Sequence, residues 1–246
     1  MTNDARGEPA ASGRPGGPER QAARVTRRWP IFSGGVAVLL VAALGAVIAY
    51  RQKNLPFSFD LAFMGELVEH RSPFWNVPAF VMNNLGGGVL GAVIIPLAII
   101  VLLLLLKWRW AALFFAIATI ASAGLVQLLK NLYDRPRPRD ILVTADLGSF
   151  PSGHVANAAT MAVLLGFILQ RTWVWISGVA YTIVMLLSRT YLGAHWLSDT
   201  VGALVLGAAV AVIAWAPLAH RLAVEHARRL VSGAGKPAAG DPTRAL

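Results

Sequence analysis

Long apolar runs are the feature of this sequence that most constrains its fold. Residues 87–106, which end in IIPLAIIVLLLLL, include no charged side chain. A helix needs roughly 20 such residues to cross the hydrocarbon core of a bilayer. Inside lipid every backbone polar group has to be hydrogen-bonded within the protein, which restricts spanning segments to helices and closed barrels. The runs therefore predict a bundle of membrane-spanning helices.

The overall composition supports this interpretation. Apolar residues make up 56% of the 246-residue chain and charged residues only 14%, whereas roughly a quarter of the residues in soluble proteins are charged. The mean hydropathy is +0.59. The sequence has no cysteine, which excludes disulfide bridges, thiolate metal sites and cysteine nucleophiles. These values indicate an integral membrane protein.

Six spans are predicted, which together form an all-α six-helix membrane bundle. The fourth and fifth are only 16 and 15 residues long, so they cross the bilayer only if residues 152–154 and 188–192 extend their helices. Between the first two spans, residues 55–84 mix aromatic, charged and proline residues, which predicts two short amphipathic helices in the membrane interface. The six spans are residues 31–50, 87–106, 110–129, 155–170, 173–187 and 200–218.

The two ends of the chain differ in composition from the middle. Residues 1–29 are rich in Ala, Gly, Pro and Arg, with almost no large apolar side chain, which is typical of a disordered segment. We expect a disordered basic tail over residues 1–29, a membrane domain over residues 30–219 and a second basic tail over residues 220–246. The first apolar run is too long, and starts too late, for a cleaved signal peptide.

Basic residues set the expected orientation. Of the 22 Lys and Arg residues, 14 lie in the two tails and in the loops KWRW and QRT, and the other eight lie on the opposite side. The positive-inside rule then places both termini in the cytoplasm. The formal net charge is +10. The basic residues that produce it collect in the tails and short loops, which fits membrane orientation and not nucleic-acid binding. We expect a multi-pass protein of a bacterial cell membrane.

Three clusters of polar residues fall on the side opposite the tails. Two spans separate the second cluster from the third, and a membrane hairpin returns the chain to the side that it left. All three clusters are therefore expected to emerge together. They are Lys130 with Arg137 and Pro138; Pro151, Ser152, Gly153 and His154; and Ser188, Arg189, His195 and Asp199.

The first chemical property of these clusters is positive charge. Lys130, Arg137 and Arg189 are three fixed cations, which match a doubly charged phosphate group. The planar guanidinium of arginine binds two phosphate oxygens at once, whereas lysine supplies a point charge. Ser152 and Gly153 stand where the fourth span begins, so their backbone N–H groups and the helix dipole are expected to face the same anion.

The second property is a pair of histidines. His195 and Asp199 are four residues apart, which on a helix places them on one face. We expect the carboxylate to accept a hydrogen bond from Nδ1–H and so leave Nε2 of His195 as a free lone pair. His195 is then the candidate nucleophile, and His154 the candidate acid that protonates the leaving oxygen and later activates water.

Each cluster taken alone also has an ordinary structural interpretation. Basic residues beside a span often bind lipid headgroups. For Arg135 and Arg139 we expect either such headgroup contacts or support of the site residues. A Pro-Ser-Gly-His tetrapeptide can start a helix with Ser as the N-cap. A His and an Asp at i, i+4 can be a helix-surface pair. The joint occurrence favours a site, because ionisable groups at membrane depth are costly.

At these residues the sequence resembles the type-2 phosphatidic acid phosphatase family, the lipid phosphate phosphatases. The three family signatures Lys-x6-Arg-Pro, Pro-Ser-Gly-His and Ser-Arg-x5-His-x3-Asp all stand here without substitution. The resemblance covers about residues 55–218. It implies an α-helical membrane bundle, a phosphohistidine intermediate on His195, acid and base catalysis by His154, and no metal or other cofactor. The site is also similar to that of vanadium-dependent haloperoxidases, which are soluble proteins.

The predicted function is therefore hydrolysis, on the extracytoplasmic side, of the terminal phosphate of a lipid phosphate or a polyprenyl diphosphate held in the bilayer. Two alternatives stay open from the sequence. A phosphotransferase would pass the phosphoryl group from the same histidine to a sugar or lipid hydroxyl instead of water. A lipid-binding or transport protein would keep the cations without turnover, but it would not need the two histidines and the aspartate. The sequence predicts no oligomeric state.

Overall fold

The computed structural model of the chain describes residues 17–51, 55–144 and 148–234, and of residues 17–27 and 231–234 the backbone alone. Over these residues the structure is helical and has no strand. The helices are α1 (Gly17–Tyr50), α2 (Ser58–Glu69), α3 (Pro73–Gly86), the π-helix η1 (Leu90–Ile94), α4 (Ile95–Leu105), α5 (Arg109–Tyr133), α6 (Gly153–Leu169), α7 (Thr172–Tyr191) and α8 (Leu197–Ala234).

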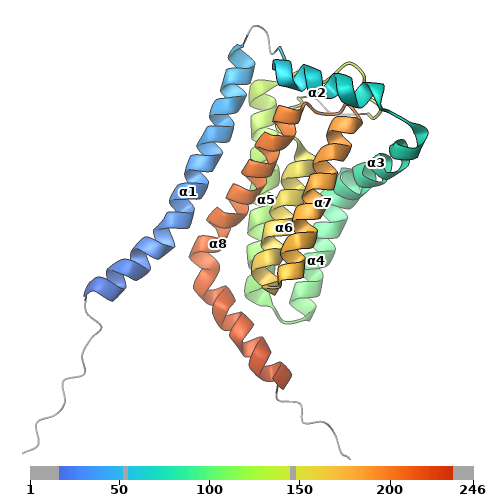
Figure 1. The fold of residues 1–246 in the computed structure, drawn as a ribbon. Helices are drawn as coiled ribbons and strands as arrows, with labels where there is room; N and C mark the ends of the chain where they lie inside the picture. The colour runs from blue at the N-terminus through green and yellow to red at the C-terminus, as the bar shows by residue number, and fades with distance from the viewer. Residues whose placement is uncertain (1–16, 52–54, 145–147, 235–246) are drawn as a thin grey trace, which may run out of the picture.

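The long helices form a bundle around α6 (Figure 1), which packs against α5, α7 and α8. Helix α1 packs along α8, and α4 packs along α5. Helix α2 lies across one end of the bundle, and α1 begins and α8 ends at the other end. The end that α2 covers is also where the chain passes from α5 to α6 and from α7 to α8.

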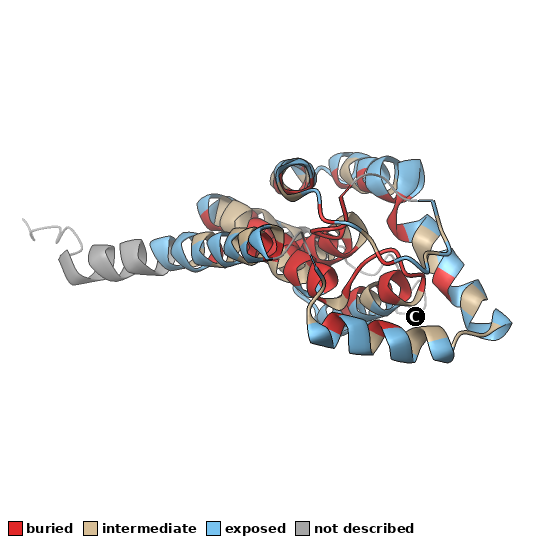
Figure 2. Ribbon diagram, turned by 90° about the horizontal axis from the view of Figure 1, so that it is seen from above, coloured by how far each residue is buried: buried red, intermediate tan, exposed pale blue. Residues whose placement is uncertain are grey.

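The buried residues lie along the bundle axis (Figure 2), and many large apolar side chains are exposed on its outside. Phe114 and Leu164 are completely buried, whereas Leu105 and Ile120 are 74% and 72% exposed. A soluble bundle would place polar side chains on that outer surface. The exposed apolar surface is what contact with lipid requires, and the structure is accordingly that of a multi-pass membrane protein.

Helix lengths indicate fewer membrane spans than the six that the apolar runs of the sequence predict. Four helices are long and apolar enough to cross a membrane, and the bent pair of α3 with η1 and α4 makes a fifth if it counts as one span. Helix α6 has only 17 residues. The predicted extensions are confirmed, since α6 begins at Gly153 and α7 continues to Tyr191. The described residues thus give four or five candidate spans, and the count of six stays a prediction.

The predicted boundaries of the tails need correction. Helix α1 begins at Gly17, inside the segment expected to be disordered, and α8 continues to Ala234, well beyond residue 219. Both extensions are rich in Ala and Arg, which have high helix propensity, so each apolar helix continues into its basic flank. The remaining predicted tail residues, 1–16 and 235–246, lie outside the described part.

A predicted span also begins differently from expectation. The apolar run from residue 87 does not form one straight helix, because α3 ends at Gly86 and the chain breaks at Gly87 and Gly88 before η1 begins. Gly88 has φ +58°, a left-handed conformation that favours glycine. The two short helices predicted within residues 55–84 are confirmed as α2 and α3.

A single carboxylate fixes α8 to the start of α5. Helix α5 has no side-chain N-cap of its own, and Glu225 of α8 accepts hydrogen bonds from the backbone N–H groups of Trp110 (3.1 Å) and Ala111 (3.0 Å). Arg229 binds the same carboxylate at 2.7 Å and stacks on the ring of Trp108. Glu225 therefore satisfies N–H groups that a helix start leaves without partners.

We predict that Glu225→Ala lowers the stability of the purified protein. Loss of an N-terminal cap costs about 1–2 kcal/mol, which for a chain of this length lowers Tm by about 2–8 °C. Thermal unfolding in detergent measures the shift, with Glu66→Ala on the exposed face of α2 as the control. Equal Tm values for the two variants would contradict the capping role.

Candidate active site

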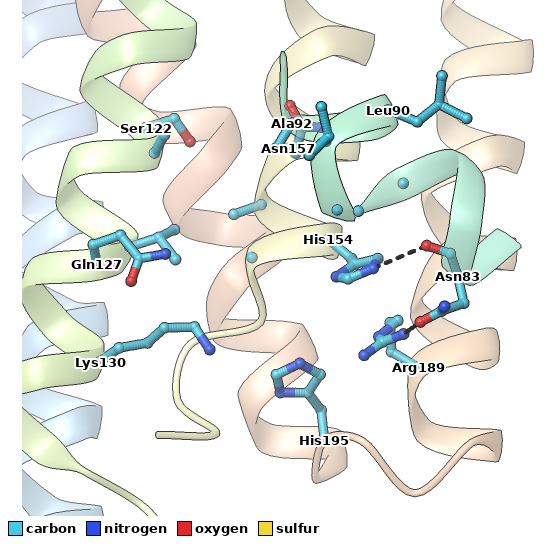
Figure 3. A pocket seen from close by; sticks show the side chains of 18 of the residues that line it. Asn83, Leu90, Ala92, Ser122, Gln127, Lys130, His154, Asn157, Arg189 and His195 are labelled. Carbon is cyan, nitrogen blue, oxygen red and sulfur yellow. Dashed lines mark hydrogen bonds between the residues drawn. The ribbon is translucent and has the colours of Figure 1, made fainter. Parts of the chain in front are cut away.

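A cavity of about 580 Å³ opens at the end of the bundle that α2 covers. Its wall includes the three predicted cations and both predicted histidines, of which Figure 3 labels Lys130, Arg189, His154 and His195. From there the cavity extends along α5 past Gln127 and Ser122 to Thr119, opposite η1 and α4. The site residues on its wall are Lys130, Arg137, Gly153, His154, Arg189 and His195.

Local sequence explains how the cations reach the cavity. Lys130 and Arg189 stand in the last turns of α5 and α7, where the helix dipole favours positive charge. Helix α5 ends because Asp134 adopts a left-handed conformation, φ +36°. The sequence DRPRP follows, and residues that precede proline avoid helical backbone. Arg137 therefore lies on an extended segment that passes the mouth of the cavity.

Neutral oxygens hold the cations in place. Lys130 Nζ donates to the carbonyl of Gly148 at 2.8 Å, and Arg137 donates to the carbonyls of Ala194 (2.6 Å) and Gly148 (3.1 Å). Arg189 is 3% exposed, and its Nη1 donates to the side-chain oxygen of Asn83. Its Nε is buried and has no hydrogen-bond partner among the described residues. These contacts fix the three cations on the cavity wall, where a charged group forms strong hydrogen bonds to an anion.

His195 lies on the short segment between α7 and α8, with one ring nitrogen fixed. Its Nδ1 is 2.7 Å from the carbonyl oxygen of Ser149. A carbonyl only accepts, so Nδ1 carries the proton and Nε2 keeps a lone pair. Nε2 lies 3.4 Å from Nη1 of Arg137. Burial, followed by the charges of Arg189 and Arg137, lowers the pKa of His195 well below its usual range, so the ring is neutral at pH 7.

The expected pairing of His195 with Asp199 differs in detail. The carboxylate lies 3.8 Å from Nδ1, beyond hydrogen-bond length, because Nδ1–H donates to the carbonyl of Ser149 instead. Asp199 instead accepts from Ser149 Oγ (2.8 Å), the backbone N–H of Trp196 (2.9 Å) and Arg135 Nη1 (2.5 Å). Helix α8 begins only at Leu197, so His195 precedes the helix and Asp199 caps its start.

His154 stands in the first turn of α6 and faces His195 across the cavity (Figure 3). Its Nε2 is 3.1 Å from the carbonyl oxygen of Asn83, so Nε2 carries a proton and Nδ1 is the nitrogen left for the cavity. The chain at Gly87 runs directly against this ring: a Cβ there would overlap the imidazole. Glycine at this position lets the break between α3 and η1 pass over His154.

The structure places Gly153, but not Ser152, on the cavity wall, so anion binding by the N–H of Gly153 stays a prediction. Gly153 lines the cavity, and it is the first residue of α6, whose N–H group has no partner within the helix. Ser152 is completely buried outside the cavity wall, and its backbone N–H donates to the carbonyl of Asp199 at 3.3 Å. Its N–H is therefore committed to the protein and does not face an anion.

Sequence reasoning missed two residues that support this site. Asn83 contacts both His154 and Arg189, and Asp60 of α2 binds Arg135, which in turn binds Asp199. Arg135 is 1% exposed, so of its two predicted roles the structure favours support of the site over contact with lipid headgroups. Asp60 and Asn83 stand in a segment for which the sequence predicted only short interfacial helices.

Metal-binding groups do not gather in this part of the chain. Among the described residues, no set of three or more His, Cys, Asp and Glu side chains is placed to hold a metal ion. The two histidines use Nδ1 and Nε2, respectively, in hydrogen bonds to carbonyl oxygens. Independence of metal stays a prediction that a chelator tests.

Comparison with known proteins shows what the chain is similar to. The PAP2 superfamily model matches residues 109–221, which carry all of the charged residues on the cavity wall. The chain is 28% identical over 166 residues to phosphatidylglycerophosphatase B of Bacillus subtilis, covering 63% of this chain and 80% of that protein. It is 35% identical over 72 residues to undecaprenyl-diphosphatase of Sulfolobus acidocaldarius.

That second match covers 29% of this chain, and this chain spans about a third, 31%, of the length of the archaeal protein. The fold is similar to the crystal structure of a transmembrane PAP2-type phosphatidylglycerolphosphate phosphatase from Bacillus subtilis, with a TM-score of 0.62 and 25% identity. The similarity covers 76% of this chain and 94% of the other, so it extends beyond residues 109–221 to the N-terminal helices.

We predict that Arg189→Ala weakens the binding of inorganic phosphate to the purified protein by about 10–100-fold, because a hydrogen bond to a charged group contributes about 1.5–3 kcal/mol. Calorimetric titration at constant ionic strength measures the Kd. The matched control is Arg139→Ala, which removes an equal charge from an exposed position near the cavity. Equal losses in the two variants would mean that net charge, not the cavity wall, binds phosphate.

Proposed function

We propose that this chain is a membrane phosphatase that hydrolyses the terminal phosphate of a lipid phosphate or polyprenyl diphosphate through a phosphohistidine intermediate, without a metal ion. One observation carries the proposal. A neutral histidine with a fixed Nδ1 proton lies beside Arg137 in a cavity that Lys130, Arg189 and a second histidine also line. Binding an anion needs the cations alone, and the two histidines add a nucleophile and an acid.

The first step transfers the phosphoryl group to the protein. The three cations and the N–H of Gly153 bind the phosphate oxygens, and positioning with neutralised charge supplies much of the rate in phosphoryl transfer. Nε2 of His195 attacks phosphorus, forming a P–N bond as the bond to the leaving oxygen breaks. The arriving phosphate dianion favours the protonated form of His154, which gives its Nδ1 proton to the leaving oxygen.

The second step releases phosphate. His154 is now neutral, and its Nδ1 accepts a proton from a water molecule as that water attacks phosphorus and the P–N bond breaks. Inorganic phosphate leaves, and Nε2 of His195 regains its lone pair. Nδ1 keeps its proton and its hydrogen bond to the carbonyl of Ser149 throughout, which keeps the attacking nitrogen aimed at the cavity.

The similar proteins support the substrate class. Their names specify phosphatidylglycerophosphate and undecaprenyl diphosphate as substrates of those proteins. A cavity at the end of a lipid-exposed bundle lets the hydrocarbon chain stay in the bilayer while the phosphate reaches the cations. The basic residues at the opposite end support a cytoplasmic location for that end under the positive-inside rule, and the proposed site is then extracytoplasmic.

We predict that His195→Ala abolishes phosphate release from a lipid phosphate panel while the protein stays folded, because no other group on the cavity wall replaces the nucleophile. Release of free phosphate by wild type and variant is measured with and without chelator, which tests metal independence together with turnover. His154→Ala should still form the phosphoenzyme from labelled substrate and release it slowly. Full hydrolysis by His195→Ala would contradict the nucleophile, and activity lost only in chelator would require a metal.

The same assay separates hydrolysis from transfer. Phosphatase activity predicts that phosphate release equals the substrate consumed, with or without an added sugar or lipid alcohol. A fall in free phosphate with matching formation of a phosphorylated alcohol would assign the chain to the phosphotransferases.

We predict opposite accessibility for the two ends of the bundle. The chain has no cysteine, so single cysteines can be introduced at Glu66, on α2 at the site end, and at Arg228, near the end of α8. Both positions are exposed. A membrane-impermeant maleimide should label Glu66→Cys in intact cells and Arg228→Cys only after permeabilisation. The reverse pattern would place the site in the cytoplasm.

A further inference from the structure

A buried ion network lies behind the candidate nucleophile, outside the cavity wall. Arg135 binds Asp199 through Nη1 at 2.5 Å and Asp60 through Nη2 at 2.9 Å, and the three side chains are completely shielded from solvent. Ser198 joins the two ends, since its Oγ donates to Asp60 at 2.7 Å and accepts from Arg135 Nη1 at 2.7 Å. Isolated buried charges are costly, and here one arginine stands between two carboxylates.

Asp60 comes from a different part of the chain. It lies on α2, which crosses the end of the bundle next to the start of α8 (Figure 1). Besides Arg135 and Ser198 Oγ, its carboxylate accepts the backbone N–H of Ser198 at 2.9 Å and that of Phe57 at 3.3 Å. Asp60 therefore binds the first turn of α8, the helix on which Asp199 stands.

A continuous series of contacts leads from Asp60 to the attacking nitrogen. Arg135 joins Asp60 to Asp199, and Asp199 Oδ2 accepts from Ser149 Oγ at 2.8 Å. The carbonyl of Ser149 then holds Nδ1 of His195 at 2.7 Å. The position of Ser149 thus depends on a carboxylate whose other oxygen is bound to Arg135.

We propose that Asp60 is a positioning residue of the active site, which holds Arg135 so that Asp199 and Ser149 keep His195 aimed at the cavity. The inference rests on the proposed function. A guanidinium prefers to bind one carboxylate through two nitrogens, and Asp60 prevents this by occupying Nη2. Without it, Arg135 is free to turn both nitrogens to Asp199 and draw that carboxylate away from Ser149.

The alternative is that the network only stabilises the fold. The two roles differ in what they predict for phosphate binding. Asp60 and Asp199 bind Arg135, Ser198 and Ser149, whereas the cations of the cavity are held by Gly148, Ala194 and Asn83. A positioning role lowers kcat and leaves phosphate binding intact. A general loosening of the bundle affects both.

The test compares Asp60→Asn with wild type in full-length protein in detergent, with Glu66→Gln on the same helix as the control. We expect Asp60→Asn to lower kcat by about 10–100-fold, the range for residues that orient the groups contacting a reactive centre. KM and the Kd for inorganic phosphate should stay within about 3-fold of wild type, and Glu66→Gln should leave all three unchanged.

A double-mutant cycle identifies the route. Ser149→Ala removes the hydroxyl that binds Asp199 but keeps the carbonyl that binds His195. If Asp60 acts through this contact, kcat of the double variant is no lower than kcat of the less active of the two single variants. Losses that multiply, or a kcat for Asp60→Asn within about 3-fold of wild type, would overturn the inference.

If Asp60→Asn does not yield folded protein, Ser198→Ala takes its place, because it removes the hydroxyl between Asp60 and Arg135 without changing a charge. We expect a fall in kcat of about 3–10-fold with unchanged phosphate binding, and an unchanged kcat would overturn the inference. Inactive wild-type protein would overturn the proposed function itself, which distinguishes the two failures.

Discussion

The whole site depends on how four basic side chains are accommodated at one end of an apolar bundle. Arg135 is neutralised by two carboxylates in a fully buried network, whereas Lys130 and Arg137 bind backbone carbonyls and Arg189 binds an amide. Arg135 therefore organises structure, whereas the other three side chains line the cavity. The histidines are fixed by the same segments as these cations, because Ser149 binds His195 next to Gly148, and Asn83 binds both His154 and Arg189.

Much of this arrangement was readable in the sequence because a membrane restricts topology. Apolar runs located the long helices, and the return of each hairpin to the same side indicated that Lys130, His154 and His195 would meet, as their place on one cavity wall shows. Composition was a poorer guide at helix ends, since the start of α1 at Gly17 depends on helix propensity continuing past the apolar run.

Contacts made by α2 and α3 could not be read in the same way. Asp60 and Asn83 belong to no motif, and their partners Arg135 and Arg189 are 75 and 106 residues away in the chain. The i, i+4 spacing of His195 and Asp199 suggested a direct hydrogen bond, but the helix begins after His195. A local spacing rule fails where the backbone leaves the helix, and the Nδ1–H of His195 donates to the carbonyl of Ser149 instead.

The length of the cavity has a consequence for the membrane itself. From Lys130 to Thr119 the wall follows twelve residues of α5, a rise of about 16 Å at 1.5 Å per residue, comparable with half the thickness of the hydrocarbon core. If Lys130 stands at the boundary of that core, Gln127 and Ser122 carry polar surface toward the bilayer midplane. The electrical insulation between the two compartments would then fall to the far half of the bundle, where Phe114 and Phe115 pack in the core.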